Sequence, residues 1–135
     1  MSQFETVVQD LLADGLSARF RSTGDSMHPA IRDGEMIDIV PCDASSLRRG
    51  DIVLAAMTRG MTLHRIVRIT SEGIITRGDN ATDDDGIIAS ANILGKAISG
   101  PANYKWRSAA KSVKIMRFAA SLLRRLRSGS LRFQR

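Results

Sequence analysis

Cysteine, proline and aromatic residues are all scarce in this chain of 135 residues. It contains one cysteine, three prolines, one Trp, one Tyr and four Phe. The single cysteine, Cys42, cannot form an internal disulfide, and no Cys/His cluster has the spacing of zinc ligands. We therefore expect a protein of a reducing compartment that needs no metal or other cofactor. Because aromatic residues make up only 4% of the chain, its core must be mainly aliphatic.

The chain also lacks a long apolar run. No stretch approaches the roughly 18 consecutive apolar residues that a membrane-spanning helix needs. Glu5, Asp10 and Asp14 interrupt the N-terminal segment, where a secretory signal would need an apolar centre. We therefore expect a cytoplasmic protein, with peripheral contact to the inner face of the membrane as a further option.

Acidic residues are absent from the last part of the chain. Residues 105–135 hold ten Lys/Arg and no Asp or Glu, whereas residues 1–104 hold ten Lys/Arg against fourteen acids, a net charge of −4. This asymmetry divides the chain into a domain over 1–104 and a basic tail over 105–135. Apolar residues recur at helical spacing over 109–127, which predicts a basic amphipathic helix. That helix could lie on a membrane surface or pack on the domain, and no specific nucleic-acid binding is expected from charge alone.

The domain itself has the pattern of a short helix followed by many short strands. Ser2 and Glu5 form a potential capping box for a helix that ends near Asp14. Alternating or β-branched runs then predict strands, separated by turn residues. These strands cover residues 16–21, 36–40, 52–57, 61–69, 74–77 and 93–98. The pattern predicts a mainly β fold, either a small barrel or a rolled sheet.

Three groups of residues could carry chemistry. Ser26 lies in the segment Gly-Asp-Ser-Met-His-Pro, His64 lies in a predicted strand, and an acidic cluster follows it. A serine hydroxyl becomes a nucleophile when a base removes its proton, and histidine exchanges protons near neutral pH. Taken alone, Ser26 is more typical of a turn and His64 of a satisfied strand residue. Together they supply a nucleophile, a base and an orienting carboxylate.

Other assignments compete for these positions. His28 is an alternative base, but it belongs to the same turn as Ser26, only two residues away. Any carboxylate of the late acidic cluster could orient the histidine. The cluster lacks the alternating ligands and terminal Glu of a calcium-binding EF-hand loop, so we expect no metal there. Its members are Asp79, Asp83, Asp84 and Asp85.

Four segments, in order, resemble the signal peptidase I superfamily, which includes the self-cleaving LexA-like repressors. They are Gly-Asp-Ser-Met-His-Pro at 24–29, Arg-Gly-Asp-Ile-Val at 49–53, His-Arg-Ile-Val at 64–67 and Gly-Asp-Asn at 78–80. The resemblance covers residues 16–98 and implies a serine endopeptidase of the signal peptidase/LexA-like fold. Bacterial signal peptidases and LexA-like proteins have a lysine in the segment where this chain has His64. The endoplasmic-reticulum and archaeal signal peptidases have a histidine there, and this chain is similar to that variant.

The resemblance implies a role for each site residue. Ser26 would be the nucleophile, His64 the base and Asp85 the orienting acid, with Asp84 and Asp83 as alternatives. The backbone N–H of Ser26 would stabilise the oxyanion. Signal peptidases often add a hydroxyl two residues before the nucleophile, a position held here by Gly24, so Thr23 is the candidate replacement. The supporting residues would be Gly24, Asp25, Met27, Pro29, Asp79 and Asn80, with Asp79 fixing the loop beside the site.

The chain departs from its relatives at the N-terminus. Signal peptidases carry an apolar anchor helix, and LexA-like proteins carry a DNA-binding domain and a cleavable linker. Only 25 residues precede Ser26, so we expect cleavage of a separate leader or precursor peptide, with small side chains near the scissile bond, rather than self-cleavage. A catalytically silent peptide-binding module and a LexA-like regulator are the alternatives.

Overall fold

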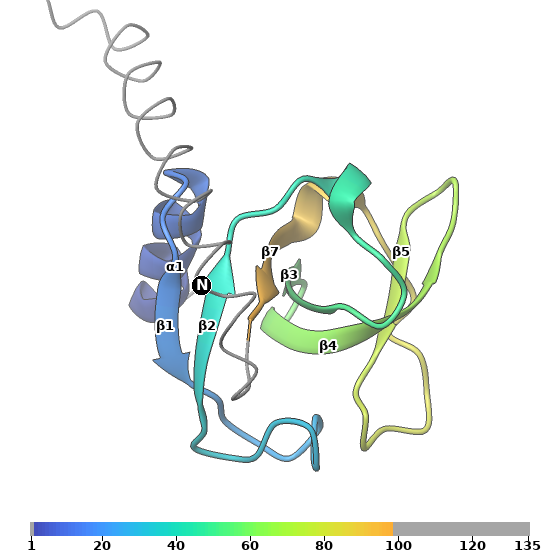
Figure 1. The fold of residues 1–135 in the computed structure, drawn as a ribbon, viewed down its shortest axis with the longest axis horizontal. Helices are drawn as coiled ribbons and strands as arrows, with labels where there is room; N and C mark the ends of the chain where they lie inside the picture. Colours follow the sequence, from blue (N-terminus) through green and yellow to red (C-terminus); the bar gives the residue numbers. More distant parts are fainter. Residues whose placement is uncertain (1, 99–135) are drawn as a thin grey trace, which may run out of the picture.

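The computed structural model describes residues 2–98, which form one helix and a seven-stranded sheet (Figure 1). The helix is α1 (Gln3–Ala13). The strands are β1 (Ala18–Arg21), β2 (Met36–Val40), β3 (Ile52–Met57), β4 (Gly60–Ile69), β5 (Ile74–Arg77), β6 (Ile87–Ile88) and β7 (Ile93–Ala97). Short 3-10 turns cover Ala44–Ser46 and Ser90–Asn92.

All strand pairs of this sheet are antiparallel, in the order β1-β2-β7-β3-β4-β5-β6. The sheet curls, but β1 and β6 are its two edges, so it is a rolled sheet and not a closed barrel (Figure 1). The mainly β prediction is confirmed. The strand β6 was not predicted, because two residues are too few to show a period.

The N-terminal helix begins with the predicted capping box. The Ser2 hydroxyl accepts from the Glu5 backbone N–H, and the Glu5 carboxylate accepts from the Ser2 N–H. Val8 and Leu12 are buried against the first of two core clusters. This cluster lies between α1 and the first strands, and its other buried members are Ala18, Met27, Ile31, Ile37, Ile39 and Leu54.

A second core cluster lies under the other half of the sheet. Its buried members are Leu47, Val53, Ile66 and Ile74. Cys42 packs against it half-buried, and burial raises the pKa of its thiol. The core is therefore aliphatic, as the composition predicts, and Cys42 fills space within it.

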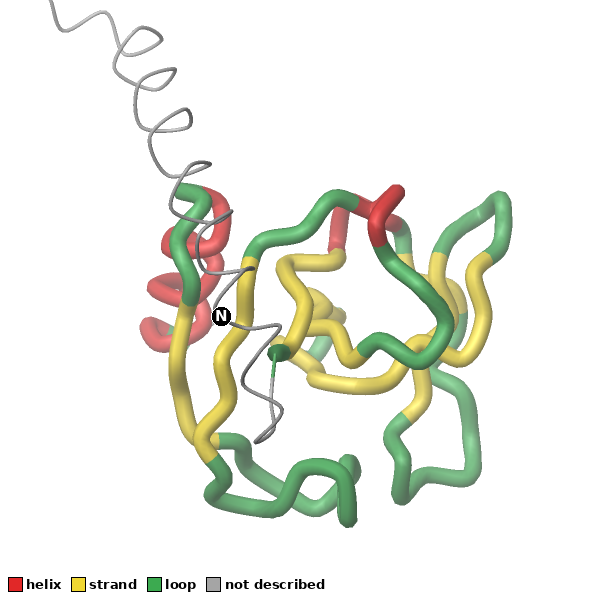
Figure 2. The backbone as a smooth tube through the Cα atoms, in the orientation of Figure 1, coloured by secondary structure: helices red, strands yellow, loops and turns green. Residues whose placement is uncertain are grey.

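Two long loops leave the sheet on one side (Figure 2). The first joins β1 to β2 across residues 22–35, and the second joins β5 to β6 across residues 78–86. The backbone N–H of Asn80 donates to the backbone carbonyl of Ser26 over 2.8 Å. The two loops are therefore joined to each other directly.

The predicted helix over 109–127 lies outside the described residues, so it stays a prediction, as does the division at residue 104. Within residues 2–98 the structure contains no helix that is long and apolar enough to cross a membrane.

Candidate active site

Ser26 lies at the surface in a tight turn of the first loop. The His28 N–H donates to the Asp25 carbonyl, and the Ile31 N–H donates to the Met27 carbonyl. The side chain of Met27 is buried in the core below this turn. The turn therefore has a buried anchor and an exposed serine. The His28–Pro29 peptide bond is cis.

His64 lies on β4 at the point where the pairing of this strand changes. Val53 of β3 is its cross-strand partner, whereas pairing with β5 begins only at the next residue, where Arg65 faces Arg77. The second loop leaves β5 directly after Arg77. The register therefore places the imidazole beside the beginning of that loop.

The structure brings Ser26, His64 and Asp85 into one hydrogen-bonded line. His64 Nε2 lies 3.2 Å from Ser26 Oγ, and His64 Nδ1 lies 2.6 Å from Asp85 Oδ2. An ionised carboxylate only accepts hydrogen bonds, so Nδ1 carries the proton and Nε2 is left to accept from the serine hydroxyl. This is the tautomer in which histidine can act as a base toward serine.

The Asp85 carboxylate has a second partner that the sequence did not reveal. The Thr76 hydroxyl donates to Asp85 Oδ2 over 2.6 Å, the same oxygen that His64 contacts. Thr76 is 1% exposed. The Asp85 backbone N–H also donates to the Thr76 carbonyl over 2.9 Å. Both the backbone and the carboxylate of Asp85 are thus fixed by one buried strand residue.

The Gly-Asp-Asn segment holds the nucleophile turn in place. Asn80 donates its backbone N–H to the Ser26 carbonyl and its side-chain amide to the Asp25 carbonyl, the latter over 3.3 Å. A Cβ on Gly78 would lie 2.6 Å from the Ser26 carbonyl oxygen and 3.1 Å from His64 Nε2. Only glycine leaves room for this approach.

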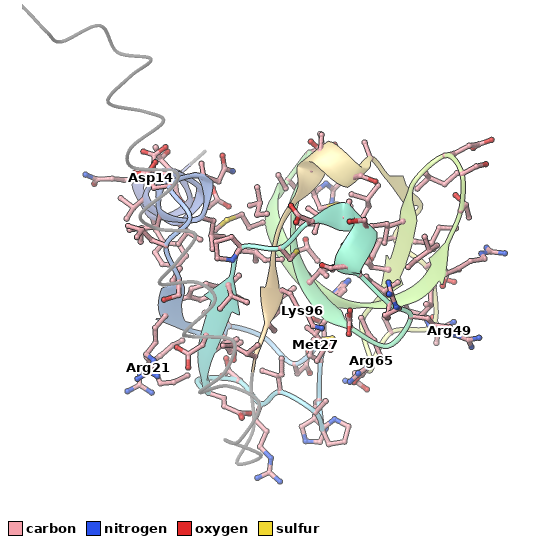
Figure 3. The ribbon with its side chains drawn as sticks, turned by 45° about the horizontal axis from the view of Figure 1, so that its top comes forward. Asp14, Arg21, Met27, Arg49, Arg65 and Lys96 are labelled. Atoms are coloured by element: carbon pink, nitrogen blue, oxygen red, sulfur yellow. The ribbon has the colours of Figure 1, made fainter. Side chains whose placement is uncertain are left out.

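Asp79 lies next to the site and binds residues other than the candidate catalytic three. Arg65 donates two hydrogen bonds to its carboxylate, from Nε and Nη2, each over 2.8 Å. The backbone N–H of Asp79 also contacts the Met27 sulfur at 3.5 Å. In Figure 3, Met27 and Arg65 lie close to each other in the projection. The bidentate guanidinium lowers the pKa of Asp79 below its ordinary value.

The candidate oxyanion donors differ in whether they already make a hydrogen bond within the protein. Among the described residues, the backbone N–H of Ser26 makes no hydrogen bond. The backbone N–H of Gly24 is already bound to Asp33 Oδ1 over 2.9 Å. Thr23 lines the same groove as Ser26 and is exposed.

The competing assignments do not make these contacts. Within residues 2–98, no hydrogen bond joins the His28 ring to Ser26. Asp84 pairs with Arg77 at 3.5 Å, and Asp83 is exposed. Over the same residues, no cluster of three or more His, Cys, Asp or Glu is placed to hold a metal ion.

An open groove of about 760 Å³ begins at Ser26 and His64. Its lining mixes polar and apolar residues, and it includes residues 61–64 of β4 and the first turn of α1. The lining residues include Thr23, Leu54, Met61 and Leu63. A groove beside a serine–histidine pair is a candidate binding site.

Fold and site together define a mainly β protein with the residue set of a serine hydrolase. The chain belongs to the Peptidase S24-like family, whose profile matches residues 5–98. This family comprises serine peptidases and LexA-like proteins, and some of its members are non-catalytic. The resemblance to the signal peptidase/LexA-like superfamily is thus confirmed. A search of curated proteins gives no match.

Proposed function

We propose that this protein is a serine endopeptidase that cleaves a leader or precursor peptide in trans. The observation that carries the proposal is the continuous chain of contacts from Ser26 Oγ through the His64 ring to the Asp85 carboxylate. Both contacts are within hydrogen-bond reach before any substrate is bound. The His64 and Asp85 side chains are 13% and 20% exposed, so the base is shielded while the nucleophile is open to the groove.

The first half of the reaction forms an acyl-enzyme. Ser26 Oγ attacks the carbonyl carbon of the scissile bond while His64 Nε2 takes the hydroxyl proton. The charge that develops on the substrate oxygen faces the backbone N–H of Ser26, with Thr23 as the second candidate donor. His64 then gives its proton to the leaving amine, and the C–N bond breaks.

The second half regenerates the enzyme. Water attacks the Ser26 ester as His64 Nε2 removes its proton, and the same proton returns to Ser26 Oγ as the ester bond breaks. Asp85 stays ionised throughout and stabilises the imidazolium that forms twice in each cycle. Removing one oxyanion donor from such a site typically costs about 10²–10³ in rate. Gly24 offers no side-chain hydroxyl, so a slow enzyme is expected unless Thr23 supplies the second donor.

The sheet offers the substrate an edge to bind along. Residues 60–64 of β4 pair with β3 only, because pairing with β5 starts at Arg65. Within the described part of the chain, no other strand pairs with this edge of β4, which adjoins the groove that contains Ser26. The Met61 N–H at its far end is bound by the Glu5 carboxylate, so the free part of the edge is the part nearer to His64. An extended peptide could add to it by main-chain hydrogen bonds. The cytoplasmic location, small side chains at the scissile bond and the substrate's identity as a leader stay expectations from the sequence and the family.

The test is cleavage of a diverse peptide library, read by mass spectrometry. Wild type should cut at recurrent sites. Ser26→Ala and His64→Ala should each lower the cleavage rate by at least about 10³-fold, because the serine and the histidine act together and neither works without the other. Asp85→Asn should lose less than either, since the nucleophile and base remain.

The matched control is Ser22→Ala, which removes a hydroxyl from the same loop and the same groove but leaves the Ser26–His64 contact intact. It should keep wild-type cut sites, with a modest loss of stability. If wild type and Ser26→Ala process the library identically, the peptidase proposal is wrong. Binding of the same peptides without cleavage would then identify a silent binding module.

A further inference from the structure

The N-terminal helix exposes two large apolar side chains. Phe4 and Val7 are each 52% exposed, although the helical pattern predicts that both lie on the apolar face with Val8 and Leu12. Only Val8 and Leu12 are buried in α1. Leaving a phenylalanine half in water forgoes part of the roughly 1.5–3 kcal/mol that full burial provides. The position of Phe4 therefore needs an explanation.

Phe4 lines the far end of the groove that begins at Ser26, whereas Val7 does not. Its ring packs edge-to-face against Phe20 of β1, with centroids 5.4 Å apart. Phe20 also lines the groove, and Met61 of β4 completes the apolar surface at this end. An aromatic pair and a methionine thus face the space that leads to the nucleophile.

Glu5 fixes the first turn of α1 against the sheet. Glu5 Oε1 accepts the backbone N–H of Met61 over 3.1 Å, while Oε2 completes the helix cap. A Cβ on Gly60 would collide with this carboxylate. The hydrogen bonds from Ser2 and Met61 lower the pKa of Glu5, so it stays ionised and bound at neutral pH. The wall that carries Phe4 is therefore held in a defined place.

We propose that Phe4 and the first turn of α1 form a distal subsite that selects a bulky apolar side chain of the peptide substrate. Met61 and His64 are three residues apart on β4, which is roughly 10 Å along a strand. A peptide extended along β4 has the same rise per residue as the strand. Its side chain about three residues from the scissile bond would then reach Phe4, Phe20 and Met61. The inference rests on the proposed peptidase function.

The chemistry of this end of the groove favours an apolar occupant over a charged one. The Glu5 carboxylate is already bound by two backbone N–H groups, and Arg21 donates to the Gly34 carbonyl over 3.0 Å. A side chain such as Leu or Phe would cover the exposed ring of Phe4. Discrimination by one or more methylene groups in such a pocket amounts to about 10–200-fold.

The experiment compares cut-site profiles of wild type, Phe4→Ala, Phe4→Leu and the matched control Val7→Ala on one peptide library. Wild type should show enrichment of Leu, Met or Phe at one position two to four residues from the cut bond, by about tenfold or more over Ala. Phe4→Ala should lose this enrichment, so that Leu, Met or Phe at that position is no longer preferred over Ala. Phe4→Leu should retain most of it, and Val7→Ala should match wild type.

Three results would overturn the inference, and they distinguish a wrong subsite from a wrong function. If wild type cuts peptides with no apolar preference at that distance, or if Phe4→Ala keeps the preference, the subsite is wrong while the peptidase function stands. If wild type cuts nothing, the proposed function fails and the subsite fails with it. A thermal unfolding curve for each variant separates a lost preference from a lost fold.

Discussion

At the scale of single residues, the Asp85 carboxylate depends on a threonine that no motif marks. Two hydrogen bonds of 2.6 Å converge on its Oδ2 atom, one from His64 and one from Thr76. A carboxylate that is free to rotate would orient the imidazole less well. Thr76 is thus a positioning residue, because it acts on the reaction through Asp85.

We expect Thr76→Val to lower kcat by roughly 10–100-fold, because small misplacements of catalytic groups have effects of that size, and to leave KM nearly unchanged. Stability should fall by about 1–2 kcal/mol, since a buried hydrogen bond is lost. Thr76→Ser keeps the hydroxyl and should restore most of the rate. The measurements are steady-state kinetics and the NMR signal of the His64 Nδ1 proton.

The outcome for the serine variant decides between positioning and packing. If Thr76→Ser is as slow as Thr76→Val, a hydroxyl at this position does not sustain the rate, and the loss reflects the packing of the buried side chain rather than its hydrogen bond to Asp85. An unchanged Nδ1 proton signal in Thr76→Val would also contradict a role in holding Asp85.

At the scale of elements, the two loops meet where Gly78 passes Ser26. The contact is so close that an added methyl group would lie 2.6 Å from the Ser26 carbonyl oxygen, which is backbone and cannot swing away. The loop or the serine turn must therefore shift. The hydrogen bond from Asn80 to the same carbonyl would be strained as well.

We expect Gly78→Ala to abolish most activity while the sheet stays folded. The fitting control is Gly50→Ala, because Gly50 has a φ of +94° and nothing within 4 Å of an added Cβ. Gly50→Ala should cost about 1 kcal/mol or more in stability through backbone strain and keep its activity. Kinetics and thermal unfolding of both variants test this, and full activity in Gly78→Ala would show that the close contact between the two loops is not needed.

At the scale of the whole molecule, the Arg65–Asp79 pair links the site to the pH dependence of stability. The pKa of Asp79 is lowered in the folded protein, chiefly by its hydrogen bonds with Arg65. A depressed folded pKa adds stability that is fully present above the unfolded value. That stability is lost as pH falls through the lower folded pKa.

We expect the free energy of unfolding of wild type to exceed that of Asp79→Asn by a constant amount near neutral pH. The difference should shrink only once the pH falls below the ordinary aspartate value of 3.8. Urea unfolding at a series of pH values measures it. A difference that already declines between pH about 7 and 5 would contradict this, because aspartate is ionised throughout that range.

Much of this molecule could be predicted from local patterns, since they report local forces. The Ser2–Glu5 cap was visible because a capping box has a fixed spacing of three residues. The strands were visible because backbone geometry sets their alternation. Ser26 and His64 stood out through their motifs. Thr76 did not, because Ile-Ile-Thr-Arg is an ordinary strand sequence. Phe4 looked like a core residue because it belongs to the apolar face of the helix. Helical spacing does not show how much of that face the sheet will cover.

The order of the three site residues along the chain has a consequence for biosynthesis. His64 follows Ser26 by 38 residues, and Asp85 follows His64 by 21. A growing chain that has emerged from the ribosome as far as β4 carries the serine and the histidine but neither Thr76 nor Asp85. Because the missing strand and loop also hold the serine turn, newly made protein would stay inert until residues 76–85 have appeared. Under the proposed peptidase function, cutting would thus begin only after the second loop has been made.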